Sequence, residues 1–362
     1  MENKKLEQLT LLKEELSKIE DKAFNVYFYT VDSRGAHSGY LAYLYETAYH
    51  LKEMGYNVHM LHQEQDFVGV GSWMGEKYAE IPHHNIEKEQ INISLSDVLF
   101  IPELFSNVMK HTEKAPCKRV IIMQNMDLMT QIIPAGQSWS DFGIKECVAS
   151  TSLLEEKLKG MFPSLKTHVV EPLVDENIFN HTDEPKKLIV NVIAKNQSDV
   201  NKIVKPFFWK YPMYRWVAFR ELRGLKREDF AEALKESAIT VWVDTDTYFG
   251  YSAVEALKCG NIVIGKVPET PPSWMVNGDE FVNNGVWYYN NDDVHTLIAG
   301  AIESFIKDNI HPDVYNEIDK MNDAYTTTSF KESLKRVYVD GIFETHKNNI
   351  KLLLSSLESV NK

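Results

Sequence analysis

The chain has 362 residues, of which 44% are hydrophobic and 25% charged, values typical of a folded globular protein with more than one domain. Its formal net charge of −13 argues against general binding to nucleic acid or to anionic membranes. No apolar run approaches the roughly 18 residues of a membrane span, and Cys117, Cys147 and Cys259 lack the CxxC spacing of a zinc site or disulfide framework. These features predict a cytoplasmic protein with no integral membrane segment and no metal site.

The first half of the chain follows an alternating strand and helix pattern. An amphipathic helix over residues 4–20 comes first, because leucine and isoleucine recur there every three or four positions. The following elements are a strand at 24–30, a turn containing Gly35 and Gly39, a helix at 41–55, strands at 56–61, 97–104 and 118–126, and a helix at 152–160. Such alternation indicates a parallel sheet covered on both faces.

The stretch 167–187 reads as a strand followed by Pro172, Pro185 and a polar cluster, and is predicted to be an interdomain linker. A second alternating series begins after it. Its predicted elements are strands at 188–194, 214–219, 238–243 and 261–265, and helices at 198–209, 227–237 and 252–259. Residues beyond about 294 are helical by pattern. The predicted domains are an N-terminal helix at 1–22, two α/β domains at 23–180 and 181–330, and C-terminal helices at 331–362 that return to the first α/β domain.

Basic residues are concentrated in one segment of this acidic chain. Between Lys186 and Lys235 there are twelve lysines and arginines against five acidic residues. A local excess of this kind indicates an anion-binding site, or else a basic face that is only solvated. The sequence leaves both interpretations open.

One stretch within that half carries a more specific pattern. Residues 246–264, "DTYFGYSAVEALKCGNIVI", read as a turn after a buried strand, a short helix, a glycine stop and a further strand. The helix begins at the carboxyl end of a parallel strand, where free backbone N–H groups commonly hold phosphates. A plain crossover that binds nothing is the alternative.

The same residues resemble a family signature. Thr247-Tyr248-Phe249-Gly250, four residues, Glu255-Ala256, three residues and Gly260-Asn261-Ile262-Val263 resemble the carboxyl-proximal motif of the family 4 type of retaining GT-B glycosyltransferases. The segments "VVEPLVDENIF", "VPETPPSWMVNGDEFVNNGVWY" and "SRGAHSGY" are similar to that family's linker, following loop and N-terminal glycine loop. The likeness covers about residues 24–305. It implies an α/β GT-B fold, in which two Rossmann-like parallel-sheet domains face a cleft.

The resemblance also implies roles for single residues. Glu255 corresponds to the glutamate that accepts hydrogen bonds from the nucleotide ribose, and the N–H groups of Gly250, Tyr251 and Ser252 are expected at the donor diphosphate. Lys195 and Lys202 stand where the family neutralises the leaving diphosphate, and His37 is a third candidate catalytic residue. The further residues expected at the donor are Gly35, Gly39, Thr247, Phe249, Arg220 and Arg223.

Two positions depart from the family pattern, and both face the sugar in the family. Thr247 stands where a glutamate usually contacts the sugar, with Asp246 one position out of register, and the residues Gln124, Asn125 and Asp127 replace a usual histidine. The identity of the sugar therefore stays open. The family is thought to react by front-face displacement, so the resemblance requires no protein nucleophile.

Acceptor contacts are expected in the loops at 32–40, 62–78 and 124–143. Their candidate residues are Phe67, Trp73, Asn125, Asp127 and Trp139. Aromatic side chains without many basic neighbours suit a sugar better than a nucleic-acid backbone.

The sequence thus predicts a retaining hexosyl- or pentosyltransferase. It moves a sugar from a nucleoside diphosphate sugar, with UDP-sugar expected, to a hydroxyl acceptor, a saccharide or small molecule, and needs no other cofactor. Two alternatives stay open: transfer to a modified nucleic-acid base, and a catalytically silent binding protein of the same fold. An NAD enzyme fits poorly because "VDSRGAHSGY" is not GxGxxG. The sequence makes no prediction of oligomeric state.

Overall fold

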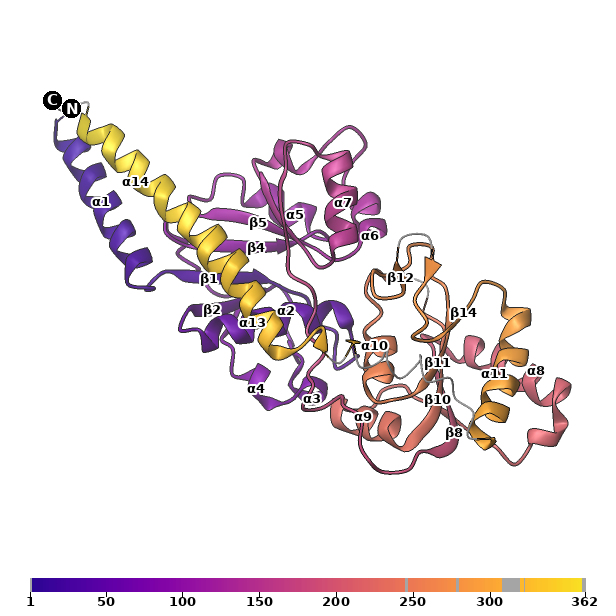
Figure 1. The fold of residues 1–362 in the computed structure, drawn as a ribbon. Coiled ribbons are helices and arrows are strands. Elements are labelled where there is room, and N and C mark those ends of the chain that lie inside the picture. The colour runs from indigo at the N-terminus through magenta and orange to yellow at the C-terminus, as the bar shows by residue number, and fades with distance from the viewer. Residues whose placement is uncertain (1, 245–246, 278–279, 308–319, 322, 360–362) are drawn as a thin grey trace. The chain divides into compact units, whose positions relative to one another are not determined.

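The structure is a computed structural model that describes residues 2–244, 247–277, 280–307, 320–321 and 323–359, with the backbone alone for residues 2–5. Asp246 lies outside the described residues. The chain divides into two compact units (Figure 1). Unit 1 comprises Met1–Glu171 and Phe330–Lys362, and unit 2 comprises Pro172–Ser329. The C-terminal segment therefore belongs to the unit that contains the N-terminus.

Unit 1 is built on a seven-stranded sheet in which every strand pair is parallel. The strand order is β3-β2-β1-β4-β5-β6-β7. The strands are β1 (Asn25–Tyr29), β2 (Asn57–His62), β3 (His83–Asn85), β4 (Val98–Pro102), β5 (Lys118–Met123), β6 (Glu146–Ala149) and β7 (Lys166–Val169). The central strands are buried on both faces because they consist of apolar runs such as Val98–Pro102.

The helices of unit 1 cover this sheet and extend beyond it. The helices are α1 (Glu2–Glu20), α2 (Gly39–Glu53), α3 (Gly71–Met74), α4 (Glu76–Ala79), α5 (Ser106–His111), α6 (Met126–Ile132), α7 (Ser152–Met161) and α14 (Glu344–Ser359). Helix α14 follows α13 (Thr327–Leu334) and a π-helical stretch at Lys335–Phe343, and it runs alongside α1 (Figure 1). Within the described part of the chain, no helix combines the length and apolarity needed to cross a membrane.

Unit 2 contains a five-stranded parallel sheet in the order β14-β11-β10-β8-β9. The strands are β8 (Lys187–Ile193), β9 (Ala218–Glu221), β10 (Ser237–Trp242), β11 (Ile262–Lys266) and β14 (Val286–Tyr288). Helices α9 (Arg227–Glu236) and α10 (Tyr251–Lys258) pack on one face. Helices α8 (Gln197–Lys210) and α11 (Asn291–Ile306) pack on the other, and β12 (Val276–Asn277) and β13 (Glu280–Phe281) form a separate hairpin.

Most predicted elements are present within a few residues, and the exceptions are short or unusual. Strands β3, β6, β12, β13 and β14 were not predicted; β3 has the sequence His-His-Asn, which carries no apolar signal. The predicted strand at 214–219 is wrong in its first half. There the chain forms a 3₁₀ turn at Pro212–Tyr214, and β9 begins only at Ala218. Tyr214 is drawn into that turn because its ring packs on Phe207 of α8.

Both sheets reverse their winding beside their first strand. In unit 1 the chain adds β2 and β3 on one side of β1 and then places β4 on the other side. In unit 2 it adds β9 on one side of β8 and then places β10 on the other. Ligands of open parallel sheets bind beyond the carboxyl ends of the two strands at such a switch point. The topology therefore predicts that a ligand binds beside the residues that follow β1, β4, β8 and β10.

Candidate functional site

The carboxyl ends of β8 and β10 bring two charged side chains together in unit 2. Lys195 follows β8 and Asp244 follows β10. The Lys195 Nζ lies 3.0 Å from an Asp244 carboxylate oxygen, and the lysine side chain is 55% exposed. The predicted catalytic lysine therefore stands at the switch point, where its amine is accessible to a ligand.

The turn between β10 and α10 depends on a left-handed glycine. Gly250 has φ of +75° and ψ of 54°, a conformation that disfavours residues with a side chain. A Cβ atom at this position would also stand 2.9 Å from the Trp242 ring and 3.4 Å from the Trp274 ring. Trp274 in turn donates a hydrogen bond from Nε1 to the Phe249 carbonyl at 2.6 Å. The backbone thus passes close over two indole rings just before α10 begins.

Thr247 closes this turn from the inside. Its hydroxyl oxygen accepts hydrogen bonds from the Gly250 N–H at 2.8 Å and the Phe249 N–H at 3.4 Å. The Gly250 N–H, expected at the diphosphate, therefore already has a partner. Helix α10 pairs its own N–H groups only from Ala253 onward, through the Gly250 carbonyl at 3.0 Å. The N–H groups of Tyr251 and Ser252 precede that first helical bond, at the helix N-terminus, where the backbone favours an anion.

Glu255 lies one turn into α10, and its side chain is half-buried. Burial raises the pKa of its carboxyl to about 7, and the charge of Arg227 opposes that rise. The carboxylate makes no hydrogen bond to any residue that the structure describes, although part of the side chain remains exposed. A carboxylate in this state can gain hydrogen-bond donors from a ligand, as two ribose hydroxyls would provide.

Further basic side chains stand at the same edge of the sheet in unit 2. Arg223 follows β9, is 46% exposed and contacts Glu221 at 2.9 Å. One of its guanidinium nitrogens also donates to the Gln197 amide oxygen at 3.2 Å, at the start of α8. Lys266 ends β11, and the sequence did not single it out. The carboxyl edge thus carries cations on three strands in addition to the N-terminus of α10.

Other predicted donor residues are engaged within unit 2. Lys202 donates to Asp199 on its own helix at 2.9 Å and is 61% exposed. Arg220 donates to Asn191, Glu236 and the Ala233 carbonyl at 2.6–3.0 Å. These contacts argue against the donor role predicted for Arg220, because its guanidinium ties β9 to β8 and α9.

Phe249 also occupies a different place from the one expected at the donor. Its side chain is 6% exposed and belongs to the core cluster under α9 and α10. Its ring meets those of Tyr251 and Tyr325 edge to face, at 4.9 Å and 5.0 Å between centroids. Its contribution to the site is therefore its carbonyl, which fixes Trp274.

The switch point of unit 1 is organised by a residue that the sequence did not reveal. Glu103 directly follows β4 and is fully buried. Its carboxylate accepts hydrogen bonds from the Gln124 N–H at 3.0 Å, the Asn125 N–H at 2.7 Å and the Tyr40 hydroxyl at 2.9 Å. Burial raises the pKa of Glu103 to about 7 despite these donors. Glu103 thus joins the start of α2 to the loop after β5.

The glycine loop after β1 is held by an aspartate. Asp32 accepts hydrogen bonds from the Arg34 N–H at 2.9 Å, the Val68 N–H at 2.7 Å and the Gly69 N–H at 3.2 Å. Arg34 and Gly35 have φ of 51° and 81°, so both central residues of this turn are left-handed. The loops after β1 and β2 are therefore fixed to each other. Gly39, the other predicted glycine, is the first residue of α2.

His37 lies in that loop and stacks on Trp73, with 4.9 Å between ring centroids. Although the side chain is largely exposed, partial burial against the indole lowers the pKa of the imidazole, which is therefore neutral near pH 7. Trp73 itself is only 7% exposed. It serves as the base on which His37 rests rather than as an open stacking surface.

The remaining candidate acceptor residues are divided between loop and core. Asn125 caps α6 through its side chain, which accepts from the Asp127 N–H at 2.9 Å and the Leu128 N–H at 3.2 Å. Asp127 is exposed in the first turn of α6. Phe67 is partly exposed and stacks on His62 at 4.1 Å. These three positions remain at the carboxyl edge of the sheet.

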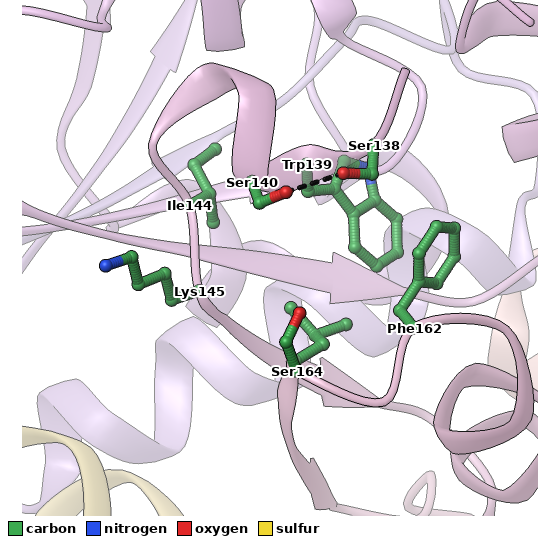
Figure 2. A pocket seen from close by; sticks show the side chains of 8 residues that line it. Ser138, Trp139, Ser140, Ile144, Lys145, Phe162 and Ser164 are labelled. Carbon is green, nitrogen blue, oxygen red and sulfur yellow. Dashed lines mark hydrogen bonds between the residues drawn. The ribbon is translucent and has the colours of Figure 1, made fainter. Parts of the chain in front are cut away.

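Trp139 lies elsewhere, in the core of unit 1. It is 1% exposed and stacks on Phe162 beside a small cavity (Figure 2). This cavity has a volume of about 30 Å³, which is too small for a sugar. It is lined by Ser138, Trp139, Ser140, Ile144, Lys145, Phe162, Ser164 and Leu165. Lys145 and Leu165 precede β6 and β7, so the cavity lies at the amino edge of the sheet, opposite the switch point. The predicted acceptor role of Trp139 is therefore not supported.

The candidate site is formed by polar and charged side chains and by backbone N–H groups. No cluster of three or more histidine, cysteine, aspartate or glutamate side chains suited to a metal ion occurs among the described residues. The residues that sequence reasoning missed share one signal: Glu103, Asp244 and Lys266 each end or directly follow a strand at the carboxyl edge.

Comparison with known proteins shows a likeness to glycosyltransferases. No protein-family model matches the chain. The curated alpha-1,6-glucosyltransferase of Actinobacillus pleuropneumoniae serotype 7 (strain AP76) is 21% identical over 261 residues, which cover 70% of this chain and 78% of that protein. A solved glycosyltransferase from Rickettsia africae ESF-5 superposes with a TM-score of 0.61 at 12% identity, covering 88% of this chain and 98% of that one.

A second solved structure, Anabaena HepE in complex with UDP-glucose, gives a TM-score of 0.59 at 12% identity over 87% of this chain and 99% of that one. At these identities the likeness is one of fold. The predicted fold class is confirmed: the chain is an α/β protein with the two Rossmann-like domains of GT-B glycosyltransferases.

We expect the Gly250→Ala variant to be less stable than Gly224→Ala. Both glycines have positive φ, +75° and +68°, but a Cβ at Gly224 meets nothing within 4 Å whereas at Gly250 it meets Trp242. The left-handed backbone lowers the free energy of unfolding of each variant by about 1 kcal/mol. In Gly250→Ala, overpacking against Trp242 lowers it by about 1–3 kcal/mol more. Urea unfolding measures both. Equal losses of stability would contradict the close packing of this turn.

The Glu255→Gln variant is expected to be more stable than the unmodified protein at pH 8. The folded-state pKa of Glu255, about 7, lies above the ordinary glutamate pKa of 4.5, so ionisation destabilises the folded state increasingly as the pH rises between these values. Glutamine removes that penalty, which we put at about 1–2 kcal/mol after discounting for partial exposure. Thermal unfolding without ligand should show the gain at pH 8 and its disappearance near pH 5. A pH-independent difference would contradict the raised pKa.

Proposed function

We propose that this protein is a retaining glycosyltransferase that moves a sugar from a nucleoside diphosphate sugar to a hydroxyl acceptor. The observation that carries the proposal is the carboxyl edge of unit 2. There the Gly250 turn presents the N–H groups of Tyr251 and Ser252, Lys195 stands at the adjoining strand, and Glu255 lies one turn further along α10. A diphosphate and a ribose diol have the charge and the hydrogen-bonding groups to satisfy these three elements together.

The donor is expected to be bound by its nucleoside diphosphate. Glu255, once ionised, accepts from the ribose hydroxyls, while Lys195 and the α10 N-terminus neutralise the diphosphate. Lys195 is paired with Asp244 in the ligand-free protein, so the arriving diphosphate competes with that carboxylate. HepE was solved with UDP-glucose, which supports a UDP-hexose as donor. The GlcNAc transferase GtfA, with a TM-score of 0.50, was solved with UDP and GlcNAc.

The transfer step needs no protein nucleophile in this scheme. The acceptor oxygen forms a bond to the anomeric carbon while the bond from that carbon to the diphosphate oxygen breaks, and the acceptor proton passes to the leaving phosphate. Negative charge on the diphosphate grows during this step, so Lys195 and the α10 N–H groups act most strongly in the transition state. Retention is supported by the curated relative's name, because an α-glucoside made from an α-linked nucleotide glucose keeps its configuration.

The acceptor is expected to be a saccharide or a small hydroxylated molecule. In unit 1 the groups at the carboxyl edge are His37, Phe67, Gln124 and Asp127, together with the fixed glycine loop. They offer ring surfaces and hydrogen-bonding groups with little positive charge, which does not favour a nucleic-acid acceptor.

A donor-binding protein without turnover is the second candidate function. Thr247 occupies the position of the sugar-contacting glutamate, and its hydroxyl is engaged with the Gly250 N–H at 2.8 Å. The sugar therefore lacks that carboxylate contact. Binding and turnover must be measured separately to distinguish the two candidates.

The test is to incubate the purified protein with a panel of nucleotide sugars and to measure release of nucleoside diphosphate. We expect turnover with at least one UDP-sugar, and we expect Lys195→Ala to lower kcat by about 100-fold, as loss of one transition-state donor does. Lys187→Ala is the matched control, because Lys187 starts the same strand and pairs with Glu236 at 2.8 Å. Lys202→Ala reports whether the second lysine acts.

Calorimetry with UDP separates the candidates. Glu255→Gln should weaken UDP binding by about 1–3 kcal/mol, and the unmodified protein should bind more tightly at pH 8 than at pH 6, because Glu255 ionises in that interval. Tight UDP binding without turnover of any donor would favour the silent binding protein. If UDP does not bind, both candidates fail.

A further inference from the structure

Unit 2 carries an exposed aromatic surface far from the proposed donor site. Trp209, Met213 and Trp216 are 76%, 62% and 65% exposed, although they follow one another closely in the chain. Large apolar side chains exposed together in this way usually mark an interaction surface. We call these three residues, with Lys205 and Arg215, the tryptophan patch.

The patch is held in place by aromatic residues that point inward. Phe207 is fully buried, and its ring lies 5.6 Å from Tyr211 and 6.1 Å from Tyr214. Backbone hydrogen bonds from Tyr214 to Tyr211, at 3.1 Å, and from Val217 to Tyr214, at 2.9 Å, close the turn that follows α8. With one set of rings fixed in the core, the intervening side chains are directed to solvent.

The patch is basic as well as aromatic. From residue 200 to residue 220 the chain has five lysines and arginines and no acidic residue, although the net charge of the protein is −13. Lys205 lies one helical turn from Trp209 on the same face of α8, and Arg215 precedes Trp216. Both basic side chains are exposed. Among the described residues, Glu303 is an acid that contacts this turn: it accepts from Tyr214 at 3.2 Å and pairs with Lys307 at 3.3 Å.

The patch is located at the amino edge of the sheet. Helix α8 starts after the carboxyl end of β8 and runs back along the sheet for 14 residues, about 21 Å. Lys195 precedes this helix and Trp209 ends it. A ligand on the patch therefore leaves the Lys195 edge of unit 2 uncovered, and the basic segment of the sequence divides into two separate regions.

We propose that the tryptophan patch docks unit 2 on the surface of a lipid bilayer that contains anionic lipids. Tryptophan is favoured at the boundary between acyl chains and head groups, and lysine and arginine near that boundary are attracted by anionic lipids. A stable protein interface needs about 800 Å² from each partner, more than three apolar side chains at a turn supply. An anionic bilayer also complements a surface segment without acidic residues.

Vesicle sedimentation tests this docking with the intact chain of 362 residues. The unmodified protein should bind vesicles of mixed phosphatidylcholine and phosphatidylglycerol, should bind pure phosphatidylcholine far less, and should be released as salt rises. Lys205→Gln/Arg215→Gln should lower the partition coefficient by about 25-fold, at about fivefold for each charge. Trp209→Ala/Trp216→Ala should abolish most of the binding that persists at high salt.

Leu352→Ala/Leu353→Ala is the matched control, because these side chains are 68% and 51% exposed on α14 in unit 1. This variant should bind vesicles as the unmodified protein does, and thermal unfolding of each variant confirms that it is folded. Unchanged binding by the tryptophan variant would overturn the proposal, as would equal binding to neutral vesicles. Salt-dependent binding to heparin but not to vesicles would identify a soluble polyanion instead. The result is independent of glycosyl transfer, which is measured with soluble UDP-sugar.

Discussion

The reversal of winding beside the first strand of each sheet is the constraint on which the rest of this molecule depends. A parallel sheet satisfies its backbone hydrogen bonds internally, so its faces are filled by apolar side chains and offer no place for a polar ligand. Only where consecutive crossovers depart in opposite directions do two loops separate at the carboxyl edge. In unit 2 that point joins Lys195 to Asp244, and in unit 1 it joins the glycine loop to Glu103.

Two glutamates with similar titration behaviour have different roles at these points. Burial raises the pKa of both Glu103 and Glu255 to about 7. Glu103 receives three hydrogen bonds from the protein itself. These bonds offset part of the free energy that burying the carboxylate costs, and they hold two loops rigidly together. Glu255 receives no hydrogen bond from the described residues. Its burial is therefore compensated only when a ligand supplies hydrogen-bond donors. Such a residue lowers the stability of the free protein in exchange for binding.

The sequence allowed the fold to be predicted well because buried parallel strands are continuous apolar runs that helices separate regularly. It failed where that signal is missing, as in the His-His-Asn strand β3, or misleading, as in the aromatic turn at Pro212–Tyr214. The motif around Gly250 lies, as predicted, in a turn between the carboxyl end of β10 and the start of a helix. The partners of individual side chains could not be predicted in the same way. Arg220 meets Asn191 and Glu236, which are distant from it in the chain, and Trp139 is buried by Phe162.

The close passage of the Gly250 turn over Trp242 and Trp274 also has an optical consequence. The two indole rings lie 6.3 Å apart, and both are buried beneath the backbone that leads to α10. Of the seven tryptophans in the chain, Trp209 and Trp216 are the strongly exposed ones. Collisional quenchers such as iodide reach the exposed pair and spare the buried pair. Trp73 and Trp139 of unit 1 are buried as well, so the emission that survives quenching is shared among the buried tryptophans, whereas the quenched emission of the unlabelled protein reports on the tryptophan patch.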